Sequence, residues 1–80
     1  MKATRHLHRK MAQFLLYLGA MMPESRFTRL EDSQPPEDEL VYVRSKCGND
    51  TTTGLGTWNK ELGFAHEEHE VPYAWAQIPE

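Results

Sequence analysis

Pro23 divides the chain into two parts that follow different hydrophobic periods. Before Pro23, apolar side chains recur at the spacings of three, four and seven residues that place them on one helical stripe. The stripe consists of Leu7, Met11, Phe14, Leu15, Leu18 and Met22. Thr4 suits the N-cap, and the Pro23 ring blocks a further helical turn. The pattern predicts an amphipathic helix over about residues 4–21 with its apolar stripe toward the core.

The residues after Pro23 predict a connection followed by strands. Residues 23–38, which include the Pro35-Pro36 pair, are typical of an irregular connection. The stretch from Ser45 to Gly56, with three threonines and three glycines, is typical of a turn-rich loop. Runs rich in β-branched and aromatic residues predict the strands, which are expected at residues 39–44, 55–59, 64–66 and 71–78.

A helix followed by a run of strands is typical of the α+β class. We expect one domain over residues 1–80, in which an N-terminal amphipathic helix packs on a small antiparallel sheet of three to four strands within residues 39–79. A chain of this length buries only roughly 60% of its unfolded surface, so a homodimer would add to its stability. Leu16 and Ala20 lie on the back of the predicted helix. They indicate either a homodimer contact through this helix or two scattered surface residues.

The single cysteine, Cys47, excludes an internal disulfide framework and favours a reducing compartment. The apolar run from Met11 to Met22 is too short to span a bilayer, and Gln13 and Tyr17 interrupt it. The basic start before this run resembles a secretory signal, but no small-residue cleavage site follows. We therefore expect a cytoplasmic protein that does not insert into a membrane.

Charge is distributed unevenly along the chain. Residues 1–29 carry six basic and one acidic side chain, whereas residues 30–80 carry three basic and eleven acidic ones. Such asymmetry indicates either an interaction surface or a basic helix that lies across its own acidic sheet. The acidic side chains that are candidates for binding a partner protein with a basic groove are Glu37, Asp38, Glu39, Glu67, Glu68 and Glu70. The same side chains could imitate the phosphates of DNA, or simply keep the protein in solution.

The basic side chains of the first part support a different hypothesis. Arg5, Arg9 and Lys10 lie near one another on the predicted helix, and Arg26 follows it closely. A basic helix face can bind the phosphates of a nucleic acid. The alternative function is therefore a nucleic-acid-binding module.

Residues 66–70 raise the possibility of a metal site. His66 and His69 are three residues apart, close enough to share one metal on a helix. The zincin pattern, however, requires histidines four apart, and no cysteine pair is present. A solvated polar loop is the alternative interpretation. The sequence has no nucleophile motif and no phosphate-binding glycine loop. We therefore expect neither an enzyme nor a resident cofactor.

Four segments after residue 28 follow a recognisable pattern. They are Glu31–Asp38 with its two prolines, Leu40-Val41-Tyr42-Val43, Gly56-Thr57-Trp58-Asn59 and the closing Val71–Glu80. Their order resembles that of a family of small phage and prophage proteins, the domain-of-unknown-function family numbered five-five-one. The usual opening Trp is missing, and Pro35 stands where Leu is common.

This resemblance covers residues 28–80, and the predicted helix lies outside it. It implies a viral or prophage origin but no activity, since the family has none assigned. We accordingly expect a small accessory protein that binds a host protein, such as a member of a defence or nucleic-acid-handling complex, and inhibits or redirects it. Trp58 and Trp75 are expected to fill the core of the sheet.

Overall fold

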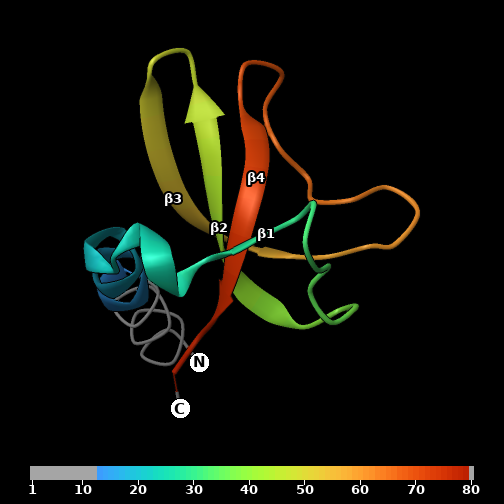
Figure 1. Ribbon diagram of the computed structural model, residues 1–80, viewed down its shortest axis with the longest axis horizontal. Coiled ribbons are helices and arrows are strands. Elements are labelled where there is room, and N and C mark those ends of the chain that lie inside the picture. Colours follow the sequence, from blue (N-terminus) through green and yellow to red (C-terminus); the bar gives the residue numbers. More distant parts are fainter. Residues whose placement is uncertain (1–12, 80) are drawn as a thin grey trace, which may run out of the picture.

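The computed structural model describes residues 13–79. It contains a helix over residues 13–21 and a four-stranded antiparallel sheet, which confirms the α+β class (Figure 1). The part of the predicted helix before residue 13 lies outside the described residues. The remaining elements are the 3-10 turn η1 (Glu24–Arg26) and the strands β1 (Thr28–Arg29), β2 (Leu40–Cys47), β3 (Asp50–Thr57) and β4 (Val71–Gln77). None of the described helical residues forms a segment long and apolar enough to cross a bilayer.

The strands lie in the order β1-β4-β2-β3, and every neighbouring pair is antiparallel. Two expectations change here. The sheet begins at β1, inside the segment expected to be an irregular connection, because Thr28 and Arg29 pair with Trp75 and Ala74. Residues 64–66 form no strand; Phe64 instead packs on the sheet as part of a loop.

The predicted loop from Ser45 to Gly56 is wrong, because β2 and β3 form one continuous hairpin across it. Pairing runs from Leu40↔Thr57 to Cys47↔Asp50 without interruption. Gly48 occupies the first position of the two-residue turn with φ 63°, which a primed hairpin turn favours and only glycine adopts freely. The three threonines have β-branched side chains that suit a strand, and they outweigh Gly54 and Gly56, which follow them.

The core has two layers, one on each face of the sheet. On the face covered by the helix, called the helix face, the buried residues are Phe27, Tyr42, Ala74 and Ala76. On the opposite face, called the loop face, Val41, Val43 and Phe64 are buried, with the half-buried Trp58 and Trp75 packed against them. Strand β2 is buried on both faces from Val41 to Ser45 and is therefore the centre of the fold.

The predicted orientation of the helix is partly wrong. Leu15 and Met22 pack on the helix-face core as expected. Phe14 and Leu18, which belong to the predicted core stripe, are instead 62% and 40% exposed. The reason is Gly19, which is buried and lies directly over Tyr42. A Cβ at Gly19 would lie 2.5 Å from two atoms of the Tyr42 ring, so the helix approaches the sheet through its glycine.

Candidate partner-binding groove

The two acidic clusters lie at opposite ends of the β2–β3 hairpin. Glu37, Asp38 and Glu39 directly precede Leu40, whose partner is Thr57. Residues 67–70 precede β4, and Glu70 contacts Thr52, whose partner is Ser45. Ser45 lies five positions after Leu40, which corresponds to roughly 17 Å along a strand. The structure therefore does not join the clusters into one acidic patch.

The first cluster belongs to a tight turn beside the end of β3. The Asp38 amide donates a hydrogen bond to the Trp58 carbonyl, 3.0 Å away, and Glu37 forms an isolated bridge with Trp58. Asp38 has a φ of 63°, in the left-handed region. The side chains of all three acidic residues are exposed. Glu39 lines a hollow with Leu40 and residues 77–79, and no other residue of its described lining carries a carboxylate.

The second cluster borders a groove on the loop face, over β2 and β3. Its volume is about 490 Å³, and its lining comes from both strands, from Pro72 of β4 and from the loop before β4. Val43 and Ser45 form its floor together with Gly54. A Cβ built at Gly54 would meet no atom within 4 Å, so the missing side chain leaves the groove open. We call this feature the sheet groove.

The rim of the sheet groove is acidic and carries no balancing cation. Glu67 and Glu70 line it with His66, and none of its described lining residues is Lys or Arg. The Thr52 hydroxyl donates to the Glu70 carboxylate at 3.3 Å, and His66 Nδ1 lies 2.7 Å from the Glu67 carbonyl oxygen. Glu68 is exposed in the same loop but does not line the groove. A floor of small side chains with a carboxylate rim can receive the aliphatic stem and the charged head of Lys or Arg.

The groove lies beside an open edge of the sheet. Strand β3 ends the sheet on one side, and no strand within residues 13–79 pairs with its outer edge. Natural edge strands are usually guarded by Lys, Pro or a bulge. In β3 the only charged residue is Asp50, and proline is absent. A strand added alongside β3 would lie about 4.8 Å from it and would point alternate side chains over the loop face.

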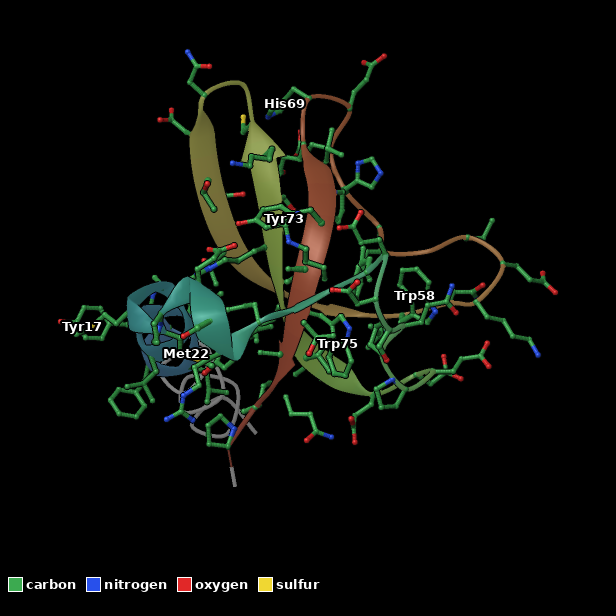
Figure 2. The ribbon with its side chains drawn as sticks, in the orientation of Figure 1. Tyr17, Met22, Trp58, His69, Tyr73 and Trp75 are labelled. Atoms are coloured by element: carbon green, nitrogen blue, oxygen red, sulfur yellow. The ribbon has the colours of Figure 1, made fainter. Side chains whose placement is uncertain are left out.

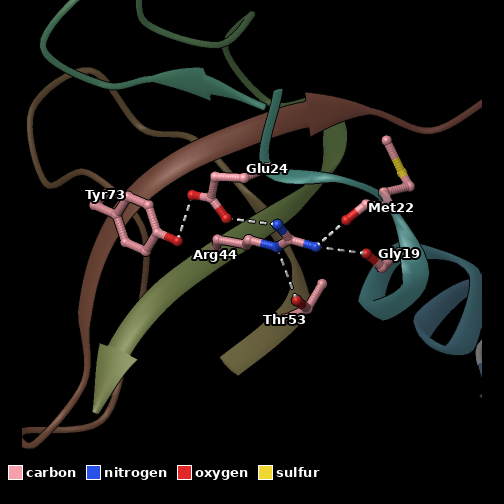
Figure 3. Close-up of polar contacts among 6 residues, drawn as sticks. All are labelled: Gly19, Met22, Glu24, Arg44, Thr53 and Tyr73. Atoms are coloured by element: carbon pink, nitrogen blue, oxygen red, sulfur yellow. Dashed lines mark hydrogen bonds and ion pairs between the residues drawn. The ribbon is translucent and has the colours of Figure 1, made fainter. Parts of the chain in front are cut away.

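The buried cation of the fold, Arg44, lies on the helix face, away from the groove. Its guanidinium forms a 2.7 Å ion pair with Glu24 and donates to the Gly19 and Met22 carbonyls at the end of the helix (Figure 3). It also lies 4.0 Å from the centre of the Phe27 ring. Cations stabilise the carbonyl end of a helix, so Arg44 fixes the helix to the sheet. We therefore assign Arg44 a structural role.

Tyr73 completes this network because of an irregularity in β4. Arg44 pairs with Ala74 but Ser45 pairs with Pro72, so Tyr73 is the extra residue of a bulge. The bulge brings the Tyr73 hydroxyl within 2.7 Å of the Glu24 carboxylate, to which it donates. This hydrogen bond and the nearby Arg44 lower the pKa of Glu24. Burial, followed by the contact with Glu24, raises the pKa of Tyr73.

The structure adds little support for the two alternative functions, nucleic-acid binding and metal binding. Of the basic set, Arg26 is exposed in η1, whereas Arg5, Arg9 and Lys10 lie outside the described residues. Both His66 and His69 are exposed. Within residues 13–79, no group of three or more His, Cys, Asp or Glu side chains is arranged to hold a metal ion. The metal interpretation therefore has no geometric basis in this part of the chain.

Comparison with known proteins adds no relative. No family model, no curated protein and no solved structure matches the chain. The resemblance of residues 28–80 to the phage family remains a prediction, and the function has to be argued from the groove itself.

Proposed function

We propose that this chain is a protein-binding module whose sheet groove receives a basic, extended segment of a partner protein. The observation that carries this proposal is the combination of an open strand edge, a groove floor left free by Gly54 and a rim with two carboxylates. In this arrangement the segment would pair with the backbone of β3 and place a Lys or Arg side chain over Gly54, with its head group at Glu67 and Glu70.

The proposal extends to the biological setting that the sequence suggests. A phage or prophage accessory protein in the cytoplasm of a host cell would use such a groove to occupy, and thereby inhibit or redirect, a basic segment of a host protein. The separation of the two acidic clusters favours this mode over DNA mimicry, which would need a continuous array of carboxylates. Binding of a basic segment would be salt-sensitive because rim charges act mainly through long-range attraction.

Two variants test the groove directly. Gly54→Leu fills the open space above the floor, and Glu70→Lys reverses a rim charge without removing a core contact. Both are expected to abolish capture of a host protein from a bacterial lysate, as judged by mass spectrometry of the co-purified proteins at low salt. Glu39→Lys, which makes the same charge change at the other end of the hairpin, serves as the matched control.

The outcome of this capture experiment is decisive. A protein that co-purifies with the wild type and with Glu39→Lys, but with neither groove variant, supports the proposal. The captured protein should then bind through a Lys- or Arg-containing peptide that can be synthesised and titrated. If the same proteins are captured by all four chains, or if none is captured by any, the sheet groove is not the binding site.

A further inference from the structure

The helix of residues 13–21 is apolar on both of its faces. Residues 13–22 contain no charged side chain. One face uses Leu15, Gly19 and Met22 to contact the helix-face core. A helix that is apolar all round is normally covered on all sides, whereas a surface helix carries polar residues on its outer face. The outer face of this helix therefore needs a separate explanation.

Four large side chains form a stripe along this outer face. Phe14, Tyr17, Leu18 and Met21 are 62%, 63%, 40% and 66% exposed. Their spacings of three, four and seven residues place them on one side of the helix. Tyr17 points away from the sheet, as Figure 2 shows. We call these four residues the helix stripe.

The helix stripe is comparable in area to the largest apolar patch of a typical monomer, and such patches are often functional. If a large apolar side chain has roughly 200 Å² of accessible surface, the exposed fractions leave on the order of 450 Å² of stripe on each copy. Two such stripes in contact would bury about 900 Å², close to the ~1,000 Å² expected of a specific interface before any flanking residue is added. A hollow of about 320 Å³ adjoins the stripe and is lined by Leu18, Met21, Met22, Pro23, Arg26 and Pro79.

We propose that the helix stripe binds the helix stripe of a second copy of this chain, with the two helices antiparallel across a two-fold axis. The residue spacing is self-complementary in this orientation. An axis between Tyr17 and Leu18 places Tyr17 of each copy beside Leu18 of the other, and Phe14 beside Met21. The second pair is an aromatic–sulfur contact, which is favourable.

The chemistry of the stripe favours a second copy over a charged partner. A two-fold contact brings identical surfaces together, so two stripes with a net charge of the same sign would repel each other. The stripe has none. The basic segment proposed for the sheet groove would find no counter-charge here. Since the helix and the groove lie on opposite faces of the sheet, the dimer leaves the groove accessible.

Sedimentation velocity of the full chain over a wide concentration range tests this pairing. The wild type is expected to sediment as a dimer at high concentration and to dissociate on dilution. Tyr17→Glu, which would bury a carboxylate against Leu18 of the other copy, is expected to give a monomer at all concentrations with an unchanged far-ultraviolet circular dichroism spectrum. Leu62→Glu, at a side chain that is 85% exposed and remote from the stripe, is the control and should remain dimeric.

A compensating variant tests the antiparallel orientation. In the double variant Tyr17→Glu with Leu18→Lys, each new carboxylate would lie beside a new ammonium group of the other copy, so the dimer should return and should weaken at high salt. A wild type that remains monomeric overturns the proposal, as does a Tyr17→Glu variant that still dimerises. A monomeric double variant would overturn the antiparallel pairing. None of these outcomes depends on the sheet groove.

Discussion

At the scale of single residues, Asp38 occupies a backbone conformation that most side chains avoid. Its φ of 63° is tolerated by Asp and Asn but is strained for β-branched residues. Asp38→Val should therefore lower the free energy of unfolding by about 1–2 kcal/mol, measured by urea denaturation, whereas Asp38→Gly should change it by less than about 0.5 kcal/mol. Glu39→Val, at an exposed neighbour, is the control. Equal losses for Asp38→Val and Glu39→Val would contradict this role.

Glu24 should make stability depend on pH. Its pKa is lowered in the folded protein, first by the hydrogen bond from Tyr73 and then by Arg44, from an ordinary value of 4.5. A carboxylate with a lowered folded pKa contributes stability above its unfolded pKa and loses that contribution as the pH falls through the folded value. Urea midpoints should therefore decline as the pH falls below about 4.5, and the decline should be smaller in Glu24→Gln.

Tyr73→Phe separates the two causes of this pH dependence. It removes the hydrogen bond to Glu24 but keeps the ring and the Arg44 ion pair, so its pH dependence should lie between those of the wild type and Glu24→Gln. The effect will be modest because the Glu24 side chain is 56% exposed and water screens the pair. An acid decline that is identical in all three proteins would show that other carboxyl groups cause it.

At the scale of elements, Gly19 and Gly54 provide a matched test of close packing, because a side chain would collide with the sheet at Gly19 and meet open space at Gly54. Gly19→Ala places a Cβ against the buried Tyr42 ring and should lower the free energy of unfolding by about 1–2 kcal/mol, although alanine favours the helix. Gly54→Ala meets open space in a strand and should raise it by about 0.5 kcal/mol. The same urea measurement serves both. A neutral Gly19→Ala would mean that the helix can move away from the sheet.

The sequence predicts some of these elements and misses others for identifiable physical reasons. The class of fold, the end of the helix before Pro23 and the strand around Val41 follow from local patterns, which act over a few residues. The glycines of Ser45–Gly56 favour a loop by local pattern, but Gly54 and Gly56 lie inside a strand that is fixed by its pairing with β2. The run of three β-branched residues, Thr51–Thr53, is the local signal that favours a strand here.

The face that the helix presents to the sheet could not be derived from periodicity alone. Because the helix is apolar on both sides, its hydrophobic periodicity is compatible with either side facing the sheet. The choice depends on the close approach of Gly19 to Tyr42, which lies 23 positions later in the chain. The same limitation applies to the candidate site. Charge alone indicates Glu67 and Glu70 as candidates, but the groove between them and Gly54 exists only once the hairpin, the bulge and the loop before β4 have formed.

At the scale of the whole molecule, the acidic rim and the apolar stripe should respond to salt in opposite ways. Binding of a basic segment at the sheet groove should weaken as ionic strength rises, because the Debye length falls from about 10 Å at 0.1 M to about 3 Å at 1 M salt. Association through the uncharged helix stripe should persist or strengthen in sulfate. Isothermal titration with the basic peptide and sedimentation of the free chain, each at low and high salt, measure the two effects. If salt changes peptide binding and self-association in the same direction, a single surface is responsible for both.

The central strand β2 is buried on both faces, so the sheet separates the helix stripe on one side from the sheet groove on the other. A dimer joined through the helix face would carry its two grooves on its far sides, facing apart. Such a bivalent molecule would hold a target that repeats its basic segment, such as a symmetric oligomer, much longer than it would hold a lone segment, because the second attachment occurs at high effective concentration. Avidity of this kind would let a chain of 80 residues compete with a larger protein for the same target.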